Sequence, residues 1–318
     1  MTQIAAAPAL EGWFIAQAAR EAVGSIDPAT ECAFALAAEG RLQPLPLNDP
    51  SAVVCWHPAV GWCSALAPDD PRRDLLDLYL PISSATPSRP ITVGHLGQSL
   101  DGFIATSSGD SCFVTGPQNI LHLHRLRALC DAVIVGARTV ETDNPRLTTR
   151  LVSGNNPLRV VIDPKSRLCA SHHVFSDGTA PTLRVIGRGT SGSARPSRPD
   201  DNVMEVERSG NALDLHDLVR QLHARGCWRI FVEGGGVTVS SFLEAGLLDR
   251  LHIAVAPLLI GEGRPAIRLA PRLQLKDCMK VRPRIYKTGE DVLFDCDLRA
   301  NEVRAPATAT SALVERVS

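Results

Sequence analysis

Trp228-Arg-Ile-Phe-Val-Glu-Gly-Gly-Gly-Val-Thr-Val-Ser-Ser241 decides the fold, because an apolar strand pattern runs into three glycines and a helical pattern follows at once. Glycines let the backbone approach a ligand closely, and the unpaired N–H groups at a helix N-terminus suit a pyrophosphate. The spacing is not Gly-x-Gly-x-x-Gly, so the segment indicates a phosphate site and not a Rossmann domain. Taken alone, a glycine turn made only for tight strand–helix packing is an equally good interpretation.

Glu233 stands at the carboxyl end of this predicted strand, where α/β sheets usually place ligand contacts. A carboxylate there can accept hydrogen bonds from sugar hydroxyls or from an amine. The alternative interpretation is a solvated acid in a loop.

Short β-branched runs alternate with helical patterns on both sides of this segment. Strands are predicted at residues 91–96, 132–136, 158–163, 182–186, 228–232, 250–256 and 291–298. Helices are predicted at residues 117–129, 213–225 and 237–245, the second capped by Asn211. Such alternation predicts an α/β layer fold around a mostly parallel sheet.

Polar motifs follow two more of the predicted strands. The first strand leads into Gly97-Gln-Ser-Leu-Asp-Gly102 and then Gly109-Asp-Ser-Cys-Phe-Val-Thr115. The second leads into Gly136-Ala-Arg-Thr-Val140 and then Asp143-Asn-Pro-Arg-Leu-Thr-Thr-Arg150. Each motif is weak in isolation, since a residue such as Thr139 is more often a helix cap and one such as Arg150 a surface charge.

Composition narrows the class of protein. The 318 residues suggest about two domains, and 44% hydrophobic with 21% charged residues excludes a disordered chain, a coiled coil and collagen. We find no membrane-spanning stretch and no secretory signal, and therefore expect a cytoplasmic protein without a membrane partner. Nine cysteines without a Cys-x-x-Cys pair predict free thiols and no metal site. A net charge of −1 argues against a nucleic-acid partner.

Three regions are expected along the chain. Residues 1–89 are acidic, with a helical pattern at 12–23 and a short strand at 53–56, and the Pro- and Ser-rich stretch 81–90 is predicted to be a linker. Residues 90–300 form the α/β domain, with a mobile loop at 187–202, and residues 301–318 form a flexible tail. The N-terminal region lacks His-x-Glu and Pro-Cys-x-x-Cys, so it is not a zinc deaminase.

Six motifs in register resemble one family. Ser-Leu-Asp-Gly, Asp-Ser-x-Phe-Val-Thr, Leu126-Arg-Ala128, Gly-x-x-Thr, Asp-Asn-Pro-x-Leu-Thr-x-Arg and Val-Glu-Gly-Gly together look like the reductase domain of the bacterial riboflavin-biosynthesis deaminase–reductase. The resemblance covers residues 90–298 and implies a dihydrofolate-reductase-like, three-layer α/β fold with a mostly parallel central sheet. It implies an enzyme that uses NADPH to reduce a phosphoribosylamino-pyrimidine to its ribitylamino form, and a homodimer.

The resemblance also implies roles for individual residues. The cofactor is expected at Gly97, Phe113, Thr139, Asp143, Gly235, Gly236, Val237, Thr238, Val239, Ser240 and Ser241. The phosphorylated pyrimidine is expected at Ser111, Arg127, Leu147, Arg150 and Glu233. Glu233, or a water that it holds, is the expected proton donor, and no metal is implied.

Four departures from the family pattern leave the substrate open. Phe103 replaces a residue that is often basic, Phe113 replaces a frequent tryptophan, and Pro164 replaces a serine on the adenosine side, where Lys165 and Arg167 could still pair with a 2′-phosphate. The fourth departure is the N-terminal region without a deaminase signature. Two alternatives follow: a related pterin or specialised-pyrimidine reductase, and a non-catalytic domain that binds a nucleotide or phosphosugar.

Overall fold

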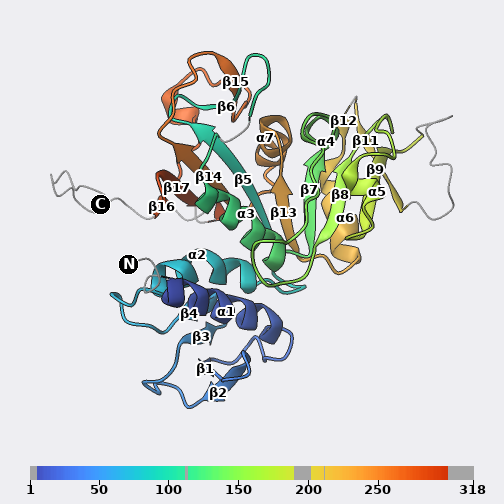
Figure 1. Ribbon diagram of the computed structural model, residues 1–318. Coiled ribbons are helices and arrows are strands. Elements are labelled where there is room, and N and C mark those ends of the chain that lie inside the picture. The colour runs from blue at the N-terminus through green and yellow to red at the C-terminus, as the bar shows by residue number, and fades with distance from the viewer. Residues whose placement is uncertain (1–5, 112–113, 190–201, 211, 300–318) are drawn as a thin grey trace.

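A computed structural model describes residues 6–111, 114–189, 202–210 and 212–299 of the protein. Within these residues a nine-stranded sheet forms the centre of the molecule (Figure 1). Its order is β10 (Val203–Val206), β9 (Thr182–Gly187), β8 (Leu158–Ile162), β7 (Ala132–Gly136), β13 (Arg229–Glu233), β5 (Ile91–Ser99), β14 (Arg250–Ala256), β17 (Asp291–Asp297) and β16 (Pro283–Thr288). Neighbours from β10 to β14 are parallel, whereas β17 and β16 run antiparallel.

Two helical layers cover the sheet. Successive side chains of a strand point to opposite faces, so a strand that is apolar throughout needs a packing partner on each face. Val133 and Val135 of β7 face the core shared with α3 (Pro117–Leu129), whereas Ala132 and Ile134 face the core shared with α6 (Leu215–Ala224) and α7 (Gly236–Glu244). The predicted three-layer α/β fold is confirmed. Short elements complete it: α4 (Ala137–Asp143), α5 (His173–Ser176), the pair β6 (Phe103–Thr106) and β15 (Gly263–Pro265), the pair β11 (Arg208–Ser209) and β12 (Ala212–Leu213), and a 3-10 turn (Leu275–Asp277).

The predicted strands and helices of the α/β domain are all present, with two corrections. Asp214 caps α6 by accepting the N–H groups of His216 and Asp217 at 2.9 and 3.2 Å, so the helix begins at Leu215 and Leu213 belongs to β12. The expected cap, Asn211, lies outside the described residues. Edge strands β10 and β16 were not predicted; in β16, exposed Arg284, Ile285 and Lys287 weaken the apolar alternation.

The N-terminal region is a four-stranded antiparallel sheet with two helices. Its elements are α1 (Ala6–Ala22), β1 (Cys32–Leu36), β2 (Leu42–Leu45), β3 (Val54–His57), β4 (Gly61–Ser64) and α2 (Arg73–Ser83), with strand order β2-β1-β3-β4. Trp13 of α1 and Tyr79 of α2 pack edge to face with ring centres 5.7 Å apart. They belong to the same buried cluster as Leu126 and Phe231, so one apolar core joins this region to the central sheet.

The predicted linker at 81–90 is wrong in its first half. Pro81 lies inside α2, and residues 82–85 are buried. Proline has no N–H to donate to the carbonyl four residues earlier, and that carbonyl, of Asp77, instead accepts a hydrogen bond from Arg284 Nη1 at 3.1 Å. Tertiary contact therefore completes the helix where its own backbone cannot. The expected mobile loop and tail fall mostly outside the described residues.

Asp131 joins four segments at the amino edge of the sheet. Its carboxylate accepts the backbone N–H groups of Trp228 and Arg229 at 3.0 and 2.8 Å and the Arg20 guanidinium of α1 at 3.0 Å. Arg229 Nη1 lies 3.6 Å from the same carboxylate, and Arg229 Nη2 donates to the carbonyl of Ala85 just beyond α2 at 2.9 Å. Loss of Asp131 therefore leaves a buried guanidinium without its counter-charge.

We predict that Asp131→Ala lowers the free energy of unfolding by about 3–5 kcal/mol, the usual result of removing one partner of a buried ion pair. Urea titration followed by far-UV circular dichroism measures the change. Asp69→Ala is the matched control, because Asp69 is exposed, and it should change stability by no more than about 0.5 kcal/mol. Equal midpoints for both variants would contradict the role assigned to Asp131.

Candidate active site

The carboxyl ends of β5, β7 and β13 meet at one edge of the sheet (Figure 1). Strand β13 lies between the other two, pairing Val232 with Ile134 of β7 and Glu233 with His95 of β5. Since all three strands are parallel, the motifs that follow them come to the same edge. The structure thus brings together the three polar constellations that the sequence places after separate strands.

Glu233 and Arg127 form a bidentate ion pair at this edge. Arg127 Nε donates to Glu233 Oε2 at 2.8 Å, and Arg127 Nη2 donates to Oε1. Arg127 Nη1 also donates to the carbonyl of Thr148 at 3.2 Å, and the arginine is only 7% exposed. Arg127 therefore orients Glu233 and the loop around Thr148. This is the contact pattern expected of an arginine whose partner is a neighbouring acid.

The loop after α4 holds an unusual backbone conformation. Asn144 and Leu147 have φ angles of 41° and 54°, in the left-handed region that side chains other than Asn and Gly rarely adopt. Leu147 is nevertheless buried, so packing of its side chain compensates for the strain. The conformation carries the chain past Thr148 to Arg150, which reaches the rim of the same edge.

Arg150 offers an accessible guanidinium beside this loop. Its side chain is exposed, and Nη1 donates to the Thr148 hydroxyl at 2.7 Å. Burial of part of the group, together with the neighbouring Arg127 and Arg146, lowers the pKa of Arg150. Glu233 and Asp177 act in the opposite direction on this pKa, so carboxylates offset part of the positive charge around Arg150.

His124 supports Arg150 and was not singled out from the sequence. Its Nδ1 accepts the backbone N–H of Arg150 at 2.9 Å. Burial, then Arg127 and Arg150, lower the pKa of His124 to about 4, so the imidazole is neutral at pH 7 and can act as this acceptor. The one available signal was its position one turn before Arg127 on α3.

The glycines of the edge differ in why they must be glycine. A β-carbon on Gly236 would collide with the carbonyl of Ala266, one on Gly97 would lie 2.8 Å from Thr115 Cγ2, and one on Gly136 would lie 2.6 Å from Thr238 Oγ1. At these three positions, close packing explains why the residue is glycine. A β-carbon on Gly235 would meet only Thr139 Oγ1, at 3.3 Å. Gly235 therefore borders open space.

Gly235 is also the N-cap of α7. Its N–H donates to Thr139 Oγ1 at 3.1 Å, and no side chain caps the helix. The first N–H groups of a helix lack intrahelical partners, so the N-terminus of α7 and the open side of Gly235 form a surface that suits an anion. Thr139, expected at the cofactor, is the residue that holds this turn in place.

The other expected site residues divide by exposure. Val237, Ser241, Asp143 and Ser111 are exposed, and Thr238 is half-buried. Val239 is fully buried in the core, and the Ser240 hydroxyl accepts the N–H of Arg268 at 2.8 Å. The structure therefore does not bring Val239 and Ser240 to the surface of the site. Phe113 lies outside the described residues.

Asp101 of the Ser-Leu-Asp-Gly motif has a structural contact set. Its carboxylate accepts the Ser99 hydroxyl at 2.5 Å and the N–H groups of Ile260 and Gly261 at 3.1 and 2.7 Å. These bonds tie the end of β5 to the segment after β14. Within the part of the chain that is described, no group of three or more His, Cys, Asp or Glu is placed to hold a metal ion, and no helix is long and apolar enough to cross a bilayer.

Comparison with known proteins shows which family shares this architecture. The family model described as the RibD C-terminal domain matches residues 91–292. The 2,5-diamino-6-ribosylamino-4(3H)-pyrimidinone 5′-phosphate reductase of Methanothermobacter thermautotrophicus is 37% identical over 223 residues, which is 65% of this chain and 97% of that protein. The riboflavin biosynthesis protein RibD of Aquifex aeolicus is 30% identical over 66% of this chain, which spans only 58% of that relative's length.

Solved structures agree with the sequence comparison. The diaminohydroxyphosphoribosylaminopyrimidine deaminase/5-amino-6-(5-phosphoribosylamino)uracil reductase of Thermotoga maritima aligns with a TM-score of 0.56 and 26% identity, covering 71% of this chain and 61% of that one. The Saccharomyces cerevisiae riboflavin biosynthesis reductase Rib7, at 20% identity and a TM-score of 0.52, shares the fold. The resemblance stated from the six motifs is confirmed, and the chain belongs to the RibD C-terminal domain family, the pyrimidine reductases of riboflavin biosynthesis with a dihydrofolate-reductase-like fold.

Proposed function

We propose that the protein is an NADPH-dependent reductase that converts a phosphoribosylamino-pyrimidine to its ribitylamino form. One observation carries the proposal: the Arg127–Glu233 pair, the exposed Arg150 and the open Gly235 turn lie at one edge of the sheet. The names of two relatives support the substrate class, because a ribosylamino-pyrimidinone phosphate and a phosphoribosylamino-uracil differ in the ring and share the phosphoribosylamino group. We therefore assign roles to the site residues that would act on this shared group.

On the cofactor side, the residues present fit a dinucleotide. The N-terminus of α7 and the open face of Gly235 would receive the pyrophosphate, and Thr139 would keep the turn in place. Gly97, Asp143 and Thr238 complete the proposed contacts, with Phe113 as a further candidate. When bound, NADPH supplies the hydride, so the protein's own contribution is position and electrostatics.

On the substrate side, Arg150 would bind the phosphate and Glu233 the sugar hydroxyls. The guanidinium of Arg127 already holds both oxygens of Glu233, which leaves each oxygen a further lone pair for a hydroxyl or a water. Reduction at C1′ of the ring-opened imine form needs one hydride and one proton. A water held by Glu233 is our candidate for delivering that proton. Ser111, which is exposed, would border the same ligand, whereas Leu147, also expected there, is buried and shapes the loop that carries Arg150.

Phe103 favours a second candidate function, a related pterin or specialised-pyrimidine reductase. Its side chain is half-buried at the start of β6, opposite Pro265, where relatives often carry a basic residue. An apolar group there removes a donor near the substrate. Turnover measured on a panel of pyrimidine and pterin substrates separates the two, and NADPH binding without oxidation on any of them would point to a non-catalytic binding domain.

An exposed apolar segment supports the proposed homodimer. Leu259, Leu273, Leu275 and Met279 are 70, 97, 86 and 54% exposed, all in the segment between β14 and β16. Large apolar side chains left exposed in one segment of the chain favour an association surface there. A second copy of the chain that covers them would remove this surface from water.

We predict that Gly235→Val raises the Michaelis constant for NADPH at least tenfold without loss of fold, because the added side chain enters the space assigned to the pyrophosphate. Ten-fold weaker binding corresponds to about 1.4 kcal/mol. Gly24→Val is the matched control, since nothing lies within 4 Å of a β-carbon there. Gly236→Ala should instead lower the melting temperature, because of the clash with Ala266. Unchanged NADPH kinetics in folded Gly235→Val would remove the turn from the cofactor site.

Arg150→Ala should lower kcat/KM for the phosphorylated substrate roughly ten- to a hundredfold, the value of a hydrogen bond to a charged group. Arg150→Lys should recover part of the loss, because it keeps the charge and loses the planar fork. The Michaelis constant for NADPH should stay the same. An equal loss on the dephosphorylated substrate would show that Arg150 does not bind the phosphate.

Sedimentation velocity at micromolar concentration should give a dimer of the 34.1 kDa chain. Leu273→Glu combined with Leu275→Glu should shift it to monomer, because the charged groups cannot be buried against a second copy. Leu47→Glu is the control, an exposed leucine in the N-terminal region. A wild-type protein that sediments as a monomer is the contrary result.

A further inference from the structure

Two cysteines face each other in the small sheet of the N-terminal region. Cys55 of β3 and Cys63 of β4 are directly opposite in the antiparallel register. Side chains of directly opposite residues project from the same face of a sheet, with Cβ atoms about 4.5–5.5 Å apart. Cys55 Sγ lies 3.7 Å from the carbonyl oxygen of Cys63, so the first thiol reaches the backbone of the second. Both thiols are free in this structure.

The third cysteine of this sheet, Cys32, projects from the other face. It lies opposite Trp56 in the register of β1 and β3, and successive residues of a strand point to opposite faces. Trp56 packs on Trp62 with ring centres 5.4 Å apart, and Cys32 packs against the same apolar core. Cys55 and Cys63 therefore share a face that Cys32 does not.

The backbone at the Cys55–Cys63 pair meets the requirements of a disulfide. The N–H of Ala65 donates to the carbonyl of Val53 at 3.0 Å, and hydrogen-bonded positions recur at every second residue of an antiparallel pair. Cys55 and Cys63 are thus a hydrogen-bonded pair, whose Cα atoms stand about 5.5 Å apart. A disulfide needs a Cα separation of about 4.4–6.8 Å and a Cβ separation of about 3.5–4.5 Å. Because β4 is at the edge of its sheet, it can close the remaining distance of about 1 Å without displacing another strand.

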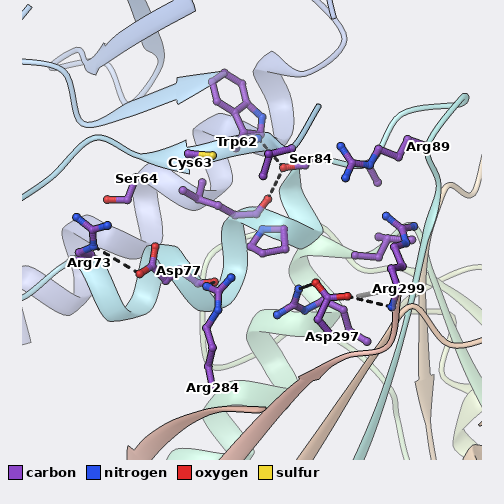
Figure 2. Close-up of a pocket in the computed structure, with 16 residues that line it drawn as sticks. Trp62, Cys63, Ser64, Arg73, Asp77, Ser84, Arg89, Arg284, Asp297 and Arg299 are labelled. Atoms are coloured by element: carbon purple, nitrogen blue, oxygen red, sulfur yellow. Dashed lines mark hydrogen bonds and ion pairs between the residues drawn. The ribbon is translucent and has the colours of Figure 1, made fainter. Parts of the chain in front are cut away.

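A cavity of about 580 Å³ gives a small molecule access to Cys63 (Figure 2). It lies between the N-terminal region and the central sheet, and its lining includes five arginines and residues as distant in the chain as Val60 and Arg299. Cys63 belongs to this lining and is partly exposed. Asp77 raises and Arg284 lowers the pKa of the Cys63 thiol through their charges, and both also line the cavity. The thiol therefore lies on the cavity side of β4.

The two thiols differ in acidity. The adjacent Cys55 thiol lowers the pKa of Cys63 by hydrogen bonding, and His57 lowers it further, against the effect of burial. The same hydrogen bond, burial, and the charges of Cys63 and Glu31 raise the pKa of Cys55. The thiolate is the nucleophile in disulfide exchange. Cys63 is accordingly the attacking sulfur, and Cys55 keeps its proton until the second step.

We propose that Cys55 and Cys63 form a reversible disulfide when the protein meets a small organic disulfide of the oxidised-glutathione class. The Cys63 thiolate attacks one sulfur of that disulfide, forms a mixed disulfide and releases one small thiolate. Cys55 then loses its proton to solvent and attacks the Cys63 sulfur, which releases the second small thiolate. Two protein thiols are thereby oxidised, and the small disulfide is reduced to two thiols that take up both protons.

The position of the pair in the sheet explains why the bond is reversible. The strands must approach each other to form it, and a disulfide that departs from relaxed geometry is more easily reduced. Excess reduced thiol therefore reopens the bond and restores the arrangement seen in this structure.

Treatment of the full chain with oxidised glutathione, followed by N-ethylmaleimide labelling and tryptic mass spectrometry, tests the proposal. The tryptic peptide 42–72 contains Cys55 and Cys63 and no other cysteine. We expect this peptide to lose two hydrogen atoms and to take up no label after oxidation. It should regain both labels after treatment with excess reduced glutathione.

Single variants separate the two steps and control for the third cysteine. Cys55→Ser keeps a hydrogen-bond donor beside Cys63 and removes the resolving sulfur, so Cys63 should accumulate as a mixed disulfide with glutathione. In Cys63→Ser, Cys55 should take up glutathione at least tenfold more slowly than Cys63 does in Cys55→Ser. Cys32→Ser is the matched control, and it should form the cross-link within twofold of the wild-type rate.

Far-UV circular dichroism confirms that each protein is folded during oxidation. Full labelling of both cysteines after oxidation of folded wild-type protein overturns the proposal, as does glutathione that stays on either sulfur without forming the cross-link. A cross-link that excess reduced glutathione fails to reopen also overturns it. Equal uptake by the two single variants would contradict the assignment of Cys63 as the attacking sulfur. All of these measurements follow thiols and not turnover, so none of them bears on the reductase proposal.

Discussion

The bidentate pair of Arg127 and Glu233 is the interaction on which the candidate active site depends. Taking two charges out of water is costly, and the cost is recovered only when geometry and further hydrogen bonds are good. Here α3 must place Arg127 opposite the end of β13, and the loop after α4 must bring the carbonyl of Thr148 within reach. The strained turn at Leu147 follows from that demand. Beyond this loop, the backbone N–H of Arg150 donates to His124 Nδ1 on α3, so the same helix that carries Arg127 also holds Arg150.

A second set of polar contacts joins the N-terminal region to the sheet. Tyr79 of α2 lies 2.6 Å from His122 Nδ1, and His122 Nε2 lies 3.0 Å from His252 Nδ1. His252 Nε2 is 3.2 Å from Asp295, the partner of Arg250 at the edge of the cavity. Burial, then the neighbouring His252 and His95, keep the pKa of His122 well below its ordinary value, so the chain runs through a neutral imidazole. With the shared apolar core, these bonds make the region part of one packed unit.

Local patterns in the sequence predicted the elements whose pattern is strong. The apolar runs of β7 and β13, the amphipathic face of α6 and the glycine turn before α7 were all visible in the chain. Edge strands such as β16, with exposed Arg284 and Ile285, lack an apolar alternation and were not. The Pro- and Ser-rich stretch at 81–90 was interpreted as a linker because composition does not show that Arg284, two hundred residues away, completes a helix containing proline.

The sequence by itself determined the family, most strands and the main helices of the α/β domain, and the three motifs that follow β5, β7 and β13, because motif spacing and periodicity are local properties of the chain. Only the tertiary structure decided which residues meet. It paired Arg127 with Glu233, separated the open Gly235 from the packed Gly97, Gly136 and Gly236, and turned Val239 and Ser240 inward. It also formed the arginine-lined cavity from segments that begin at residue 60 and end at residue 299. Contacts between segments so distant depend on how the layers pack, and no local pattern encodes them.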